Sequence, residues 1–125
     1  MEDDVGAAEA MAAVLGRAGY RVEVALSGGA ALGAVRARAP DAMLLDYELP
    51  DMDAPELLDE LRAGGPRLPF PVIVLTGARL GAADQVLSLD RGAFDYVVKG
   101  TDRQVVLARL RVALRERRGG FAVDA

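Results

Sequence analysis

The chain has 125 residues, the length of one domain, and 52% of them are hydrophobic and 27% charged, as in an ordinary globular protein. It contains no Cys and no His, which excludes disulfides, thiolate nucleophiles, zinc–thiolate sites and imidazole bases. The net charge of −4 argues against direct nucleic-acid binding, and no apolar run approaches the ~18 residues that a membrane span needs. Chemistry must therefore use carboxylates, hydroxyls and the single lysine, Lys99, which stands among 14 Arg residues.

The first part of the chain predicts two helices and two strands. Val5–Ala18 has an apolar stripe at helical spacing. Tyr20–Ala25 alternates as a strand does, and Ser27 is a good N-cap for a helix that reaches about Arg38. Asp41–Asp46 contains a short apolar run, typical of a strand buried on both faces.

The rest of the chain continues this alternation. Its predicted elements are a loop at Tyr47–Ala54, a helix from Pro55 to Gly64-Gly65, a strand at Pro71–Thr76, a helix at Leu80–Arg91, a strand at Asp95–Val98, and a helix from its N-cap Thr101 to about Arg118. Strands that alternate with helices at this spacing predict right-handed crossovers and a parallel sheet.

The alternation begins with a helix, whereas a doubly wound sheet usually opens with a strand. The expected fold is therefore α/β, a doubly wound, parallel five-stranded sheet whose first strand is truncated in this sequence. Three explanations stay open: preceding residues are missing from the sequence, strands are exchanged between two chains, or the tail Phe121–Ala125 fills the gap.

Three predicted strands have a polar side chain at their carboxyl end. Asp46 and Thr76 are the last residues of their strands, and Lys99 directly follows the strand Asp95–Val98. Each alone is explained by a strand ending. Together they matter more, because the carboxyl ends of parallel strands meet at one edge of the sheet. The acidic residues Glu2–Asp4 precede the first helix at the same edge, and clustered carboxylates favour Mg²⁺. A cation, a carboxylate nucleophile and an ammonium group are suited to phosphoryl transfer onto an aspartate.

Four segments in order resemble the receiver domains of bacterial two-component response regulators. They are Glu2-Asp3-Asp4, Met43–Asp53, Val72–Gly77 and Gly92–Lys99. The resemblance covers nearly the whole chain. It implies a receiver domain at residues 1–118 and a linker or tail toward an effector domain at residues 119–125.

The resemblance also implies the acceptor and its metal site. Asp46 would be the phosphorylated carboxylate. The Mg²⁺ ligands would be Asp3, Asp46, the backbone carbonyl of Glu48 and, through water, Glu2.

Four further residues would bind the phosphoryl group or respond to it. Lys99 would pair with it, Thr76 would move to hydrogen-bond it, and the small Gly77 would leave access to the acceptor. Tyr96 would swing inward into the space that Thr76 vacates, so Thr76 and Tyr96 would form the switch.

The resemblance implies a cytoplasmic regulatory phosphoacceptor, not an enzyme, with only Mg²⁺-dependent self-phosphorylation and slow self-dephosphorylation. A sensor histidine kinase or a phosphotransfer protein would be its phosphorelay donor. Further partners would be a C-terminal effector that regulates transcription and a second copy, bound through the last strand and its flanking helices. One alternative is a receiver-like interaction module that needs no phosphorylation. Another is an aspartyl-phosphate hydrolase, which needs an Asp where this chain has Glu48.

One residue departs from the family pattern at the lysine. The family usually has a Pro after it, joined by a cis peptide bond, and this chain has Gly100. A cis bond costs ~2.5–4 kcal/mol before Gly, against about 0.5–1 kcal/mol before Pro. The loop is therefore expected to be either trans or strained, and either outcome could alter the aim of Lys99.

Overall fold

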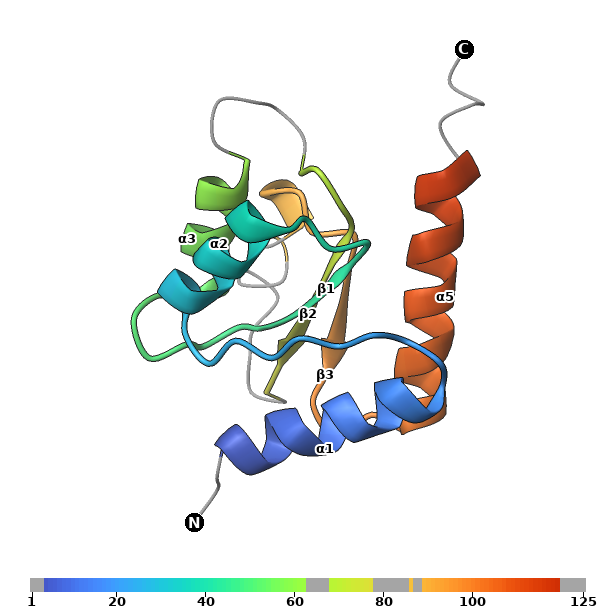
Figure 1. Cartoon of the computed structure of the whole chain (residues 1–125). Coiled ribbons are helices and arrows are strands. Elements are labelled where there is room, and N and C mark those ends of the chain that lie inside the picture. The colour runs from blue at the N-terminus through green and yellow to red at the C-terminus, as the bar shows by residue number, and fades with distance from the viewer. Residues whose placement is uncertain (1–3, 63–67, 78–85, 87–88, 120–125) are drawn as a thin grey trace.

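The structure is a computed structural model that describes residues 4–62, 68–77, 86 and 89–119. Its elements are α1 (Asp4–Arg17), α2 (Gly28–Ala37), β1 (Met43–Asp46), α3 (Ala54–Leu61), β2 (Val72–Thr76), β3 (Asp95–Val98) and α5 (Arg103–Gly119) (Figure 1). Most of the predicted helix Leu80–Arg91 lies outside the described residues. The remaining helices and three of the four predicted strands are confirmed.

The three described strands form a parallel sheet in the order β1-β2-β3. Met43 pairs with Val72 at the start of β1, and Thr76 pairs with Val98 at the end of β2. Helices α2 and α3 cover one face of the sheet, and α1 and α5 cover the other (Figure 1). This layered α/β arrangement is the predicted fold class, and it brings the carboxyl ends of all three strands to one edge.

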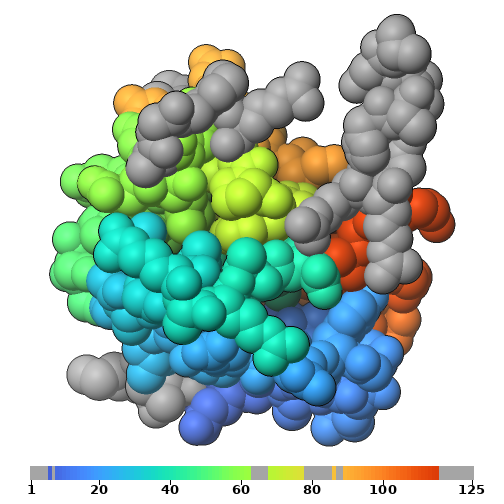
Figure 2. All heavy atoms as spheres, turned by 45° about the horizontal axis from the view of Figure 1, so that its top comes forward, coloured from blue at the N-terminus to red at the C-terminus, as the bar shows by residue number. Residues whose placement is uncertain are grey.

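Two hydrophobic clusters hold the helices on the sheet. Val72 and Val74 of β2 pack with Leu57 of α3 on one face, whereas Ile73 packs with Leu110 of α5 on the other. Figure 2 shows α2 and α3 as adjoining surfaces on one side of the molecule and α5 on the other side. None of the described helices combines the length and the apolar character that crossing a membrane requires.

The predicted strand Tyr20–Ala25 is wrong, because this segment is irregular. Tyr20 and Val22 are partly buried against the α1–α5 cluster, and Ala25 is partly buried against the α2–α3 cluster. The alternation of apolar and polar residues therefore reflects burial and not a strand. A strand also needs neighbouring backbone to bond with. Within the described part of the chain, no strand lies between this segment and the free edge of β1. Three strands of the sheet are therefore described, and the tail Phe121–Ala125 lies outside the described residues.

The predicted N-cap of the last helix is also wrong. The carboxylate of Asp102 accepts the N–H of Gln104 at 2.7 Å, while the Thr101 hydroxyl donates to the carbonyl of Val98 at 2.5 Å. Asp102 is well suited to this place because its negative charge faces the positive end of the helix dipole.

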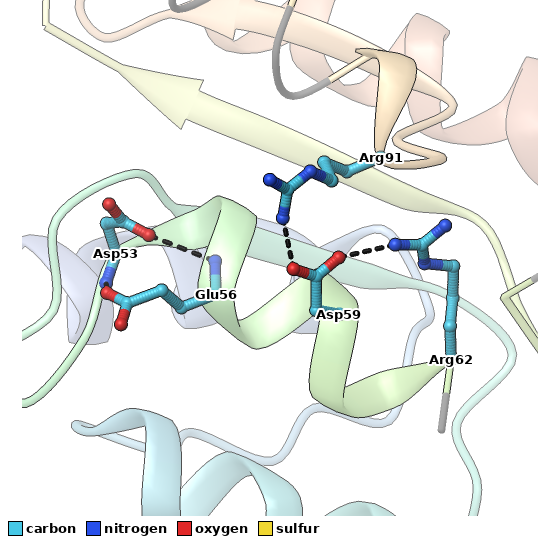
Figure 3. Close-up of polar contacts among 5 residues, drawn as sticks. All are labelled: Asp53, Glu56, Asp59, Arg62 and Arg91. Atoms are coloured by element: carbon cyan, nitrogen blue, oxygen red, sulfur yellow. Dashed lines mark hydrogen bonds and ion pairs between the residues drawn. The ribbon is translucent and has the colours of Figure 1, made fainter. Parts of the chain in front are cut away.

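Helix α3 is fixed at its start and near its end (Figure 3). Asp53 and Glu56 form a capping box, in which each carboxylate accepts the backbone N–H of the other residue at 3.0 Å. Asp59 pairs with Arg62 and with Arg91, which stands shortly before β3. These ion pairs tie α3 to the chain that enters the last strand.

Candidate functional site

Asp46, Thr76 and Lys99 meet at the carboxyl edge of the sheet, as predicted from their places on the strands. Asp46 is the last residue of β1, Thr76 is the last residue of β2, and Lys99 directly follows β3. The ammonium Nζ of Lys99 lies 2.7 Å from Oδ2 of Asp46, although the two residues are 53 positions apart in sequence. The parallel order of the strands is what creates this contact.

The Asp46–Lys99 pair is open to solvent. The side chain of Asp46 is 31% exposed and that of Lys99 is 47% exposed. The second carboxylate oxygen of Asp46, Oδ1, accepts the N–H of Glu48 at 3.2 Å. Exposed ion pairs add little to stability, so this pair makes at most a small contribution to folding.

Thr76 is fully buried, yet its hydroxyl is only weakly held. Its Oγ1 lies 3.4 Å from the carbonyl oxygen of Gly77, which is long for a hydroxyl hydrogen bond. Its carbonyl accepts the N–H of Lys99 at 2.6 Å, so the backbone joins these two residues directly. Gly77 is exposed, and beyond its chain neighbours no described residue would have a heavy atom within 4 Å of a Cβ built on it.

Tyr96 lies within β3, where it pairs with Val74 of β2. It is partly buried, as expected for an aromatic ring that carries one polar end. It stands three residues before Lys99, which directly follows the strand, so β3 brings both of these predicted site residues toward the edge.

The described part of the predicted metal site offers two oxygen donors. Asp46 supplies a carboxylate, and the carbonyl of Glu48 accepts no hydrogen bond from any described residue. Such donors fit a hard divalent cation such as Mg²⁺. Glu2 and Asp3, the other predicted ligands, lie outside the described residues, and among the residues that the structure does describe no three acidic side chains cluster.

The Lys99–Gly100 bond is trans, since the described residues contain no cis peptide bond. The sequence predicts that this loop is either trans or strained, and the structure shows the trans form. Lys99 nevertheless reaches Asp46.

The loop that follows Asp46 is anchored to α2 by Asp51, a contact that the sequence analysis missed. The carboxylate of Asp51 accepts the N–H of Gly28 at 2.8 Å and that of Gly29 at 2.9 Å. A Cβ on Gly28 would lie 2.5 Å from Sδ of Met52, so a side chain here would require the Met52 side chain to move. The sequence signal that could have predicted this contact is the pair of glycines after the Ser27 cap. Backbone N–H groups at the start of a helix attract carboxylates, and glycine has no side chain to block their approach.

This anchor makes a prediction for acid stability. The N–H groups of Gly28 and Gly29 stabilise the carboxylate and hold the pKa of Asp51 below its ordinary value of 3.8. Because the folded pKa is the lower one, the anchor stabilises the fold above the ordinary value and is lost as the pH falls through the folded pKa. We expect Asp51→Asn to unfold at lower urea than the wild type at neutral pH, and to lose less further stability on acidification. Identical acid profiles in urea titrations of the two proteins would contradict this assignment.

Comparison with known proteins gives a consistent set of relatives. A family model described as "Response regulator receiver domain" matches residues 1–111. The chain is 45% identical over 97 residues to the transcriptional regulatory protein KdpE of Mycobacterium tuberculosis (strain ATCC 25618 / H37Rv), which covers 78% of this chain and 41% of KdpE. It is 41% identical over 115 residues to the transcriptional regulatory protein CreB of Escherichia coli (strain K12), which covers 92% of this chain and 49% of CreB. The chain thus spans less than half the length of either relative.

Solved structures agree with these relatives over nearly the whole chain. The BeF3-activated N-terminal receiver domain of Klebsiella pneumoniae RstA matches with a TM-score of 0.81 and 37% identity, covering 91% of this chain and 94% of that chain. A CheY-like receiver domain protein of Methanospirillum hungatei JF-1 matches with a TM-score of 0.81 and 29% identity, covering 94% and 91%.

Proposed function

The chain belongs to the response regulator receiver domain family of two-component signalling, and from this premise we propose that Asp46 is its phosphoacceptor. The observation that carries the proposal is the 2.7 Å contact between Asp46 and Lys99, the one lysine of the chain. A carboxylate oxygen of Asp46 would attack the phosphorus atom of the donor's phosphoryl group and form an aspartyl phosphate. The bond between phosphorus and the donor atom would break, and the donor would leave with its electron pair. The Lys99 ammonium would then hold a phosphoryl oxygen as a compact point charge.

A Mg²⁺ ion would complete this site. We propose that its ligands are Asp3, Asp46, the carbonyl of Glu48 and, through water, Glu2. When bound, the ion would neutralise the carboxylates and polarise the incoming phosphoryl group. The anchor at Asp51 would keep the Glu48 carbonyl in place, and the absence of a side chain at Gly77 would leave the acceptor accessible.

Phosphorylation would act on the buried hydroxyl and the nearby ring. It adds about −1.5 to −2 charges and strong acceptor oxygens at the sheet edge. The weakly held hydroxyl of Thr76 would move to this acceptor, and Tyr96 would turn into the vacated space. The change would then reach the surface of β3 and its flanking helices.

The same premise supports proposals about partners. A sensor histidine kinase or a phosphotransfer protein would donate the phosphoryl group in the cytoplasm. An effector domain that regulates transcription would follow the receiver domain of residues 1–118, with residues 119–125 as the linker; the printed names of KdpE and CreB support this output. A homodimer would use β3 and its neighbours. Exposed apolar side chains are present there, namely Phe94 just before β3, Val98 on β3, and Val105 and Val112 on α5.

The test is labelling by acetyl phosphate with Mg²⁺, read as a mass gain of the intact chain. We expect slow, single-turnover labelling that a Mg²⁺ chelator prevents and that Asp46→Asn abolishes. Asp90→Asn, which alters an exposed carboxylate before β3, should label as the wild type does.

Other outcomes separate the alternatives. A folded chain that takes no label would support a receiver-like interaction module that is independent of phosphorylation. Rapid turnover of assorted phosphate esters would support the aspartyl-phosphate hydrolase. Labelling that survives Asp46→Asn would rule out Asp46 as the acceptor.

A further inference from the structure

Lys99 reaches Asp46 from a tight turn at the end of β3. The carbonyl of Val98 accepts the N–H of Thr101 at 3.1 Å, which places Lys99 and Gly100 at the two central positions. Gly100 has a φ of +92°, and no described residue other than glycine has a positive φ. Among the common four-residue turns, a negative φ followed by a positive φ is typical of type II, which favours glycine at the second central position.

Both sides of this turn are fastened. The N–H of Lys99 donates to the carbonyl of Thr76 at 2.6 Å, and the Thr101 hydroxyl donates to the carbonyl of Val98 at 2.5 Å. The turn is therefore bonded to β2 on one side and closed on itself on the other. Gly100 lies between Lys99 and Thr101, so its backbone conformation links these two hydrogen-bonded residues.

The need for glycine at this position is conformational and not a matter of space. Apart from its chain neighbours, no described residue would have a heavy atom within 4 Å of a Cβ built on Gly100. A side chain would thus meet no neighbour, but most residues other than glycine are strained at this φ. To relieve the strain, the turn would rotate and carry the Lys99 side chain away from Asp46.

We propose that Gly100 is a positioning residue, whose positive φ sets the turn that holds the Lys99 ammonium on Asp46. The expected effect on phosphorylation rests on the proposed function, in which Asp46 accepts the phosphoryl group. The effect of Gly100 on the Lys99–Asp46 contact does not depend on it. Gly100 therefore takes the place that the family usually gives to proline and keeps the lysine aimed by a different backbone geometry.

Three variants test the proposal. Gly100→Ala should label with acetyl phosphate about tenfold more slowly than the wild type, because its φ is strained. Gly100→Asn should stay within about threefold of the wild type, because asparagine tolerates a positive φ. Gly19→Ala is the matched control, since Gly19 also has a positive φ, +99°, with no heavy atom within 4 Å of a built Cβ, and lies after α1. It should unfold at lower urea but label at the wild-type rate.

A crystal structure of Gly100→Ala provides a readout that does not depend on phosphorylation. We expect the Lys99–Asp46 contact to be broken in this variant and kept in Gly100→Asn. A wild-type contact and rate in Gly100→Ala would overturn the proposal, as would equal slowing by Ala and Asn. If the wild type itself took no label, the proposed function would fail, and the contact in the variant structures would still decide the role of Gly100.

Discussion

Replacing Lys99 with alanine should slow the labelling of Asp46 by acetyl phosphate about a hundredfold, the usual cost of losing one donor to a developing oxyanion. The ammonium is 2.7 Å from the carboxylate before any phosphoryl group arrives, so it needs no rearrangement to act. No other lysine exists in the chain to replace it. The rate of mass gain with acetyl phosphate and Mg²⁺ measures the effect.

Two further variants make this result specific. Arg109 is another exposed cation, and it pairs with Asp95 of β3 at 2.9 Å. The variant Arg109→Ala removes this cation and should label at the wild-type rate. Lys99→Arg keeps the charge but presents a planar fork in place of a rotatable point charge, so its rate should lie between those of Lys99→Ala and the wild type. If Lys99→Ala labelled as fast as the wild type, the lysine would have no part in the transfer.

Replacing Leu57 with alanine should lower the free energy of unfolding by about 2–5 kcal/mol. Leu57 is fully buried and belongs to the cluster in which α3 packs against Val72 and Val74 of β2. The substitution leaves a cavity between the helix and the central strand, and packed interiors close such cavities only in part. Urea unfolding followed by circular dichroism measures the loss.

The matched control removes the same atoms from the surface. Leu26 is 47% exposed, so Leu26→Ala should cost less than about 1 kcal/mol. A Leu57→Ala loss as small as that of the control would mean that the α3–β2 cluster does not support the fold as described here.

The strands and the site edge could be predicted because their signals are local. The runs at Met43–Asp46 and Val72–Thr76 are apolar up to a polar last residue, as befits strands covered on both faces. The meeting of Asp46 with Lys99 then follows from one rule, that parallel strands end at the same edge. No knowledge of particular contacts is needed for that step.

The errors arose where tertiary contacts decide the outcome. Tyr20–Ala25 has the alternation of a strand, but forming one depends on a neighbour that the described sheet does not provide. Thr101 and Asp102 are both good caps in adjacent positions, and the difference is that the Thr101 hydroxyl already bonds the carbonyl of Val98. The anchor at Asp51 and the positive φ of Gly100 likewise depend on how distant segments meet.

A crystal structure with Mg²⁺ and beryllofluoride, a stable mimic of a phosphoryl group, tests the role of Asp46 most directly. We expect the beryllium to bond to a carboxylate oxygen of Asp46, with the Lys99 ammonium and the Thr76 hydroxyl both within hydrogen-bond distance of its fluorines. Beryllofluoride bound to a different carboxylate, or bound to Asp46 while Lys99 and Thr76 point elsewhere, would contradict this account.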